Sequence, residues 1–195
     1  MISSQTFARC SRRAGRALIL LAAVVSGLGI QTTPAAADSA RSISVTAHFT
    51  DPGVLVPTAT KCDIVNGVVG VPVRGSARFG MEPDDNWTGG VSYNICMYVM
   101  ADRSERFYGT ETFTGDIRSC GVGTISYNVS DGMVNPAPLG SITQHGTETW
   151  KIIPRSGTGR LSTVSAGSGS GVFTMSSTVV GGGSGVYTGT FTCKV

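Results

Sequence analysis

The chain has 195 residues, of which 15 are basic and 12 are acidic, and its formal net charge is +3. Four of the basic residues lie within positions 1–37, so the remaining 158 residues hold eleven basic and twelve acidic side chains, a net charge of −1. A nucleic-acid partner is therefore not expected, because its phosphates are neutralised by clustered Lys and Arg. The same 158 residues suffice for one domain with a sizeable core.

The first 37 residues have the pattern of a secretory signal peptide. A head with four arginines precedes an apolar run from Ala17 to about Ile30, and the alanines at 35–37 provide the small residues of a cleavage site. An uncleaved membrane anchor is the alternative, but it needs about 20 apolar residues, and this run is shorter and contains two glycines. We predict a secreted protein with no stable membrane anchor and one domain over residues 38–195.

After the leader, apolar and polar residues alternate with the period of a β-strand, and no helical period appears. Turns rich in Gly, Asp, Asn and Pro separate about eight such segments. An all-β fold made of a single closed antiparallel barrel is expected, because closure removes the exposed edges of the sheet. A two-sheet sandwich is the alternative, since its strands have similar spacing. The alternating segments cover residues 43–49, 65–79, 91–99, 107–114, 125–129, 150–152, 172–180 and 187–193.

The stretch WKIIPRSGTGRLSTVSAGSGSGVF at residues 150–173 is rich in glycine and serine. A phosphate-binding loop needs a helix after its glycines, and no helical pattern follows Gly159. GSGSG at 167–171 has Gly169 at its centre, so it is not the G-x-S-x-G of a nucleophile elbow. A linker would leave too few residues for a second domain. We interpret the stretch as the turns between late strands of the barrel.

Four cysteines follow the leader, and none of them forms a C-x-x-C pair, so a zinc site or a redox motif is not expected. In an exported protein they form two disulfides by default. In up-and-down order, Cys62 opens the second strand and Cys96 lies late in the third, at the same rim. Cys120 follows the fourth strand and Cys193 ends the eighth, at the opposite rim. We predict the pairs Cys62–Cys96 and Cys120–Cys193.

Only two histidines, His48 and His145, follow the leader. His48 alternates with apolar residues in its segment, and His145 lies in a polar stretch. Neither has the spacing of a metal-ligand set or of a Ser-His-Asp triad. We therefore expect no metal and no other cofactor.

Two glutamates share a strand face with apolar side chains. Glu111 alternates with Phe107 and Phe113, and Glu148 alternates with Trp150. If these faces point inward, desolvation raises the pKa of each carboxyl and suits it to general acid or base chemistry. Glu111, in the middle of its segment, is the candidate catalytic residue. For Glu148 we expect a position at the start of its strand, where it is solvated or hydrogen-bonded to a tyrosine.

A carboxyl on an inward face needs a partner. No Lys or Arg occupies an inward-facing position in the expected strands, so a tyrosine is the expected neighbour of Glu111. A lumen lined in this way would hold a compact hydrophobic small molecule. The expected ligand-binding residues are the aromatic and acidic side chains of the inward faces, namely Phe107, Phe113, Tyr93, Tyr127, Glu148, Trp150 and Tyr187.

Two stretches resemble the allene oxide cyclase-like barrel superfamily, to which the dirigent proteins are related. WKIIPRSGTGRL at residues 150–161 is similar to a W-x-V-V-P-G-S-G-T-G-x-L run in a bacterial branch of unknown function. FYGTETFTG at residues 107–115 is similar to that branch's Y-x-G-x-E-x-[apolar]-x-G strand. This chain departs from the pattern at Arg155, where the branch usually has Gly, around residues 83–90, and in its cysteines. The resemblance implies a closed barrel, and for an enzyme a cofactor-free isomerase or cyclase.

Three classes of function therefore remain. The first is a secreted barrel that binds a hydrophobic small molecule in its lumen. The second is the cyclase that the resemblance implies, with a lumenal carboxylate at the reacting centre. The third is a disulfide-stapled interaction or inhibitor module whose lumen is filled. An open or a packed lumen separates them, and we rank binding first.

Overall fold

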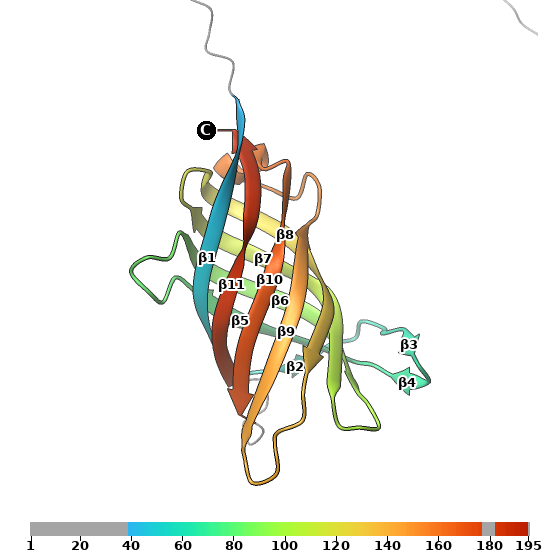
Figure 1. Ribbon diagram of the computed structural model, residues 1–195. Coiled ribbons are helices and arrows are strands. Elements are labelled where there is room, and N and C mark those ends of the chain that lie inside the picture. The colour runs from blue at the N-terminus through green and yellow to red at the C-terminus, as the bar shows by residue number, and fades with distance from the viewer. Residues whose placement is uncertain (1–38, 177–181, 195) are drawn as a thin grey trace, which may run out of the picture. The chain divides into compact units, whose positions relative to one another are not determined.

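A computed structural model describes residues 39–176 and 182–194, and the predicted signal peptide lies outside this range. Eight long strands form one closed antiparallel barrel (Figure 1). The part of the chain described contains no helix that is long and apolar enough to cross a bilayer. The barrel strands are β1 (Ala40–Pro52), β5 (Val71–Phe79), β6 (Trp87–Val99), β7 (Glu105–Ile117), β8 (Gly121–Val134), β9 (Thr143–Ile152), β10 (Ala166–Ser176) and β11 (Gly182–Lys194).

Consecutive strands from β5 to β11 are hydrogen-bonded neighbours, as expected for up-and-down order. The first strand, β1, pairs along its whole length with the last, β11, and the two lie side by side in Figure 1. The same strand β1 also pairs with β5 through Phe49 and Thr50, which closes the sheet on itself. The predicted barrel is thus confirmed, and the two-sheet sandwich is excluded.

The loop between β5 and β6 completes the seam where β1 and β5 pair only briefly. The carboxyl of Asp85 accepts hydrogen bonds from the His48 and Glu82 backbone N–H groups at 3.0 Å. The Asn86 amide accepts from the Thr46 backbone N–H at 2.8 Å and donates to the Ser44 carbonyl at 3.0 Å. These side chains satisfy backbone groups of β1 that no neighbouring strand pairs at this point. The segment around residues 83–90 therefore has a structural role in closure.

The predicted strand over residues 65–79 is wrong in its first half. Residues 64–69 form a separate hairpin of β3 (Ile64–Val65) and β4 (Val68–Val69), and β2 (Val56–Pro57) pairs with β5. Asn66 and Gly67 take φ values of 50° and 78° at the hairpin turn. An Asn-Gly pair is the strongest short-range hairpin signal, because both residues tolerate positive φ. Regular alternation concealed this turn.

The glycine- and serine-rich run is also placed differently from its prediction. The loop after β9 contains a 3-10 helix, η1 (Gly159–Thr163), but residues 166–171 belong to strand β10. Within that strand the serines are exposed, and the alternating glycines face inward. A Cβ on Gly169 would lie 2.5 Å from Cζ2 of Trp150 and would contact the Thr188 carbonyl oxygen. The glycines therefore leave room for large side chains from neighbouring strands.

Gly169→Ala is expected to lower the free energy of unfolding by about 1–3 kcal/mol, because the added methyl overpacks the core against Trp150. Ser170→Ala, on the exposed face of the same strand, is the matched control and should change stability by less than about 0.5 kcal/mol. Urea unfolding followed by tryptophan fluorescence measures both variants. Equal stability of the two would show that the glycine face does not limit packing.

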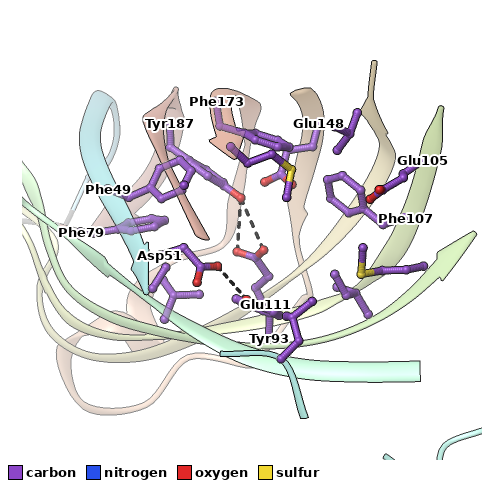
Figure 2. Close-up of a pocket in the computed structure, with 18 residues that line it drawn as sticks. Phe49, Asp51, Phe79, Tyr93, Glu105, Phe107, Glu111, Glu148, Phe173 and Tyr187 are labelled. Atoms are coloured by element: carbon purple, nitrogen blue, oxygen red, sulfur yellow. Dashed lines mark hydrogen bonds between the residues drawn. The ribbon is translucent and has the colours of Figure 1, made fainter. Parts of the chain in front are cut away.

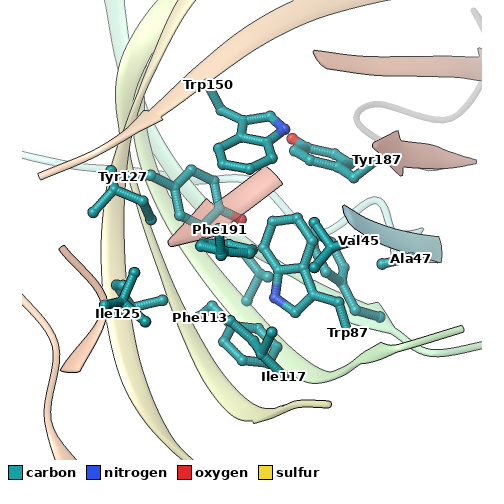
Figure 3. Close-up of a cluster of buried hydrophobic side chains, with 14 of the residues drawn as sticks. Val45, Ala47, Trp87, Phe113, Ile117, Ile125, Tyr127, Trp150, Tyr187 and Phe191 are labelled. Atoms are coloured by element: carbon teal, nitrogen blue, oxygen red, sulfur yellow. The ribbon is translucent and has the colours of Figure 1, made fainter. Parts of the chain in front are cut away.

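One end of the lumen is filled by a layer of aromatic and aliphatic side chains (Figure 3). Trp87 lies at its centre, with ring centroids 5.3 Å from Trp150, 5.2 Å from Phe191 and 5.7 Å from Phe113. Such edge-to-face contacts add to the stabilisation that burial of the rings provides. This layer holds the barrel together and forms a solid base beneath the space above it.

Both predicted disulfides are confirmed. Cys62 is bonded to Cys96 on β6, which attaches the segment that contains the β3–β4 hairpin to the barrel wall. Cys120, in the turn between β7 and β8, is bonded to Cys193 near the end of β11, and both of its sulfurs are buried in the core. Two disulfides are consistent with an oxidising, extracellular setting.

Candidate functional site

A half-enclosed pocket of about 100 Å³ (Figure 2) lies in the lumen, at the end opposite the Cys120–Cys193 disulfide. It lies where β1, β8 and β10 end and where β7 and β11 begin. Its floor is Phe79 and Tyr187, whose rings are 4.9 Å and 5.9 Å from Trp87 in the filled layer. The barrel is thus packed at one end and open to a small ligand at the other.

Glu111 extends from the middle of β7 into this pocket and is 7% exposed. The hydroxyl of Tyr187 donates to both carboxyl oxygens at 3.4 Å, so the expectation of a tyrosine neighbour is met (Figure 2). Burial raises the pKa of Glu111 to about 7, although the nearby hydroxyl of Tyr127 lowers it, and the negative charge of Asp51 raises it further. A carboxyl with this pKa is divided between its neutral and charged forms near neutral pH.

Glu148 lies in the middle of β9 and is 5% exposed, so the expectation of a solvated position at a strand start is wrong. Glu148 lines the pocket, and its buried Oε1 atom has no hydrogen-bond partner among the described residues. Burial, together with the charge of Glu111, raises the pKa of Glu148 well above its ordinary value. The sequence hides this position because β9 begins at Thr143, in a stretch with no apolar alternation.

Two further acidic side chains reach the pocket, and sequence reasoning did not find either of them. Asp51, near the end of β1, accepts a hydrogen bond of 2.7 Å from the Tyr93 hydroxyl. Burial raises the pKa of Asp51, and the hydrogen bonds from Tyr93 and from the Gly53 N–H oppose this. Burial also raises the pKa of Glu105, which is half-buried at the start of β7. Pro52 and Gly53, which follow Asp51, are typical of a turn, so the sequence did not indicate that the Asp51 side chain points into the barrel.

Aromatic rings from five strands form much of the pocket wall. The Phe49 ring centroid is 5.4 Å from that of Tyr187 and 6.5 Å from that of Phe173. Phe107 lies 6.0 Å from Phe173, and Phe79 lies 5.0 Å from Tyr187. These rings present both apolar surface and the negative faces of their π systems to a ligand.

The residues expected from the sequence separate into two groups in the structure. Those on the pocket wall are Glu111, Glu148, Phe107, Tyr93 and Tyr187. Phe113, Tyr127 and Trp150 face inward as expected, but they are at most 1% exposed and belong to the filled layer. Alternation along a strand gives the direction of a side chain but not its depth in the barrel. Phe49, Phe79 and Phe173 are the aromatic wall residues that sequence reasoning missed.

His48, Asp84 and Asp85 bring possible metal-ligand atoms within 4.8 Å of one another on the outer side of the seam. The His48 ring is 2.9 Å from Asp85, and this contact raises the pKa of His48. Burial alone raises the pKa of Asp85, but hydrogen bonds from Glu82 and His48 outweigh it and lower the value. The oxygens of Asp85 are thus already used to attach the loop to β1, so we assign this group to closure of the barrel.

Comparison of the sequence with protein-family models and with curated proteins finds no match. The function must therefore be inferred from the geometry and chemistry of the pocket.

Proposed function

We propose that the protein is exported and binds a compact, largely hydrophobic small molecule in the pocket above the filled layer. The observation that carries the proposal is an apolar, aromatic pocket at one end of an otherwise packed lumen. Small-molecule sites are typically concave and apolar with a few polar groups that fix orientation, and the mouth of a β-barrel is a common place for them. The signal peptide pattern and the two disulfides support export.

The pocket favours a binding function over a filled interaction module. Buried carboxyl groups such as Glu111 and Glu148 cost folding free energy, and the filled layer does not need them to pack. Unfavourable polar groups in a concave site are typical of function rather than of stability. The pocket volume of about 100 Å³ is two thirds of that of a cavity of about 150 Å³ that binds benzene, and the open side of the pocket leaves room for the rest of a ligand of that size.

A cofactor-free isomerase or cyclase is a second candidate, and one observation favours it. Glu111 has a pKa of about 7 and accepts a hydrogen bond from the Tyr187 hydroxyl. The site therefore contains both a proton acceptor and a hydrogen-bond donor. This pair could take a proton from a bound substrate and stabilise a developing negative charge. The resemblance of residues 107–115 to the allene oxide cyclase-like superfamily supports the same candidate. Glu111→Gln would then abolish turnover without preventing ligand binding.

Native mass spectrometry of protein purified from its own culture medium tests the binding proposal, because it detects a ligand retained through purification. The matched variant is Ala77→Ile, which fills the pocket with a residue suited to strand β5. We expect a discrete added mass on the unmodified protein, and its loss in the variant with the far-UV circular dichroism unchanged. The same added mass in Ala77→Ile would contradict binding at this site.

A further inference from the structure

We propose that the ligand of this pocket is an organic cation, a small amine whose ammonium group lies between Glu111 and Glu148 and whose apolar part contacts the aromatic wall. This inference rests on the proposed binding function and adds the chemical class of the ligand.

All the charged side chains that line the pocket are acidic. Four carboxyl groups line the pocket, and among the described lining residues there is no lysine, arginine or histidine. The four are contributed by separate parts of the barrel, with Asp51 on β1, Glu105 and Glu111 on β7, and Glu148 on β9. A buried cluster of one sign is unfavourable unless it is protonated or paired with the opposite charge. A cationic ligand supplies that opposite charge.

Glu148 provides a second, independent observation. Glu148 is only 5% exposed, and its Oε1 atom has no hydrogen-bond partner among the described residues. Figure 2 shows its carboxyl group on the same central space as those of Glu111 and Asp51. Buried polar atoms are almost always hydrogen-bonded, so an unpartnered acceptor on a pocket wall indicates a donor that arrives with the ligand. An ammonium group has up to three such donors and no acceptor.

The aromatic wall matches the rest of such a ligand. The rings of Phe49, Phe173 and Tyr187 surround the space next to the carboxyl groups (Figure 2). A cation near the face of an aromatic ring is attracted by the ring quadrupole, and the attraction grows when water is excluded. The same rings bury the carbon atoms of an amine. Anions are disfavoured in the same place, because repulsion from the carboxylates adds to the cost of their desolvation.

A single metal ion fits the pocket less well than an organic cation. Among the described residues, the only group of three possible ligands with atoms within 4.8 Å of one another is the one at His48 on the outer wall. No three of the four pocket carboxyl groups therefore lie close enough together to coordinate one metal ion. These four are Asp51, Glu105, Glu111 and Glu148. Separated carboxyl groups in an apolar pocket suit a ligand that has one charged group attached to an apolar carbon skeleton.

Three probes of similar size separate the possible ligand charges: benzylamine as the cation, benzyl alcohol as the neutral analogue and benzoate as the anion. Isothermal titration at pH 8 measures their dissociation constants with the unmodified protein. We expect benzylamine to bind at least about tenfold more tightly than benzyl alcohol, because it gains charge-assisted hydrogen bonds and a cation–π contact. Benzoate is expected to bind most weakly of the three.

Two variants locate the effect. Glu148→Gln should weaken benzylamine binding at least about tenfold and leave benzyl alcohol within about twofold, because it removes the carboxyl group that would ionise beside the ammonium and keeps the shape. Asp116→Asn removes one charge from an exposed position on β7 outside the pocket, and it should leave both dissociation constants within about twofold. Circular dichroism checks that both variants are folded.

Proton release gives a signature that nonspecific attraction to an acidic surface would not produce. The titratable groups facing Glu111 and Glu148 are Asp51 on β1, Tyr93 on β6, Glu105 on β7, Tyr127 on β8 and Tyr187 on β11. Burial raises the pKa of both glutamates, that of Glu111 to about 7, and a bound cation favours their ionised forms. Benzylamine binding at pH 6 should therefore release about one proton, measured from titrations in buffers of different ionisation enthalpy.

The outcomes distinguish this inference from the proposed function on which it rests. Equal or tighter binding of benzyl alcohol, or of benzoate, would overturn the cation inference and leave the binding function standing. An amine preference that Glu148→Gln does not reduce would place the cation elsewhere and would also overturn it. Failure of all three probes to bind would contradict both the cation inference and the binding function.

Discussion

Loss of the Cys120–Cys193 disulfide is expected to lower the free energy of unfolding by about 4 kcal/mol or more. The bond joins residues 73 positions apart, and closing a loop of that length reduces the entropy of the unfolded chain by an amount worth about 4.4 kcal/mol. Both sulfurs are buried next to the filled layer, so their loss also removes packing. Urea unfolding of Cys120→Ala/Cys193→Ala, with fluorescence of the buried tryptophans as the signal, measures the effect.

The Cys62–Cys96 disulfide is the internal control for this prediction. Its loop of 34 residues gives a similar entropy in the unfolded chain, about 3.8 kcal/mol. However, it attaches a surface segment that can detach while the barrel stays folded, so local opening limits the cost. Cys62→Ala/Cys96→Ala should therefore be less destabilising by at least about 1 kcal/mol. A larger loss in this variant would mean that the β3–β4 segment is needed to hold the barrel closed.

The second large effect is a gain of stability when the buried carboxyl groups are neutralised. Folding raises the pKa of both Glu111 and Glu148, so the folded protein binds more protons than the unfolded chain between about pH 4.5 and 7. Stability is therefore expected to fall as the pH rises through this range. A shift of the pKa of Glu111 from its ordinary value to about 7 corresponds to roughly 3 kcal/mol.

Glu148→Gln is accordingly expected to raise the free energy of unfolding at pH 8 and to change it much less at pH 4, because Gln carries no charge that burial must neutralise. Urea unfolding at the two pH values measures the difference, and Asp116→Asn, at an exposed position, is the control that should show none. Because the two glutamates interact, Glu111→Gln/Glu148→Gln should gain less than the sum of the single variants. Loss of stability at pH 8 in Glu148→Gln would indicate that the carboxylate has a favourable partner in the folded protein.

These expected gains and the ligand proposal have the same cause. The carboxyl groups that an organic cation would neutralise are the ones that destabilise the empty pocket. Binding of benzylamine should therefore raise the melting temperature of the unmodified protein more than that of Glu148→Gln, since a ligand that binds only the folded state stabilises it. Residues that cost stability without a ligand are the usual result of selection for a functional site.

The alternation of apolar residues was sufficient to determine the class of fold and the direction of many side chains. Successive side chains on a strand point to opposite faces, so the inward position of Glu111 follows from its spacing to Phe107 and Phe113. Up-and-down order then brings each cysteine to a rim, which is why both disulfide pairs could be predicted from the sequence. These properties depend on neighbours in the chain or on strand order alone.

The depth of each inward residue was decided only by the tertiary structure. Phe107 and Phe113 share one face of β7, yet the first lines the pocket and the second belongs to the filled layer. Which residues of different strands meet at one height depends on strand stagger and on bulges, such as the register shift between Phe107 and Gly109. The alternation is a local property, whereas the register joins segments far apart in the chain, and for that reason Asp51 and Glu148 could be placed beside Glu111 only once the barrel was closed.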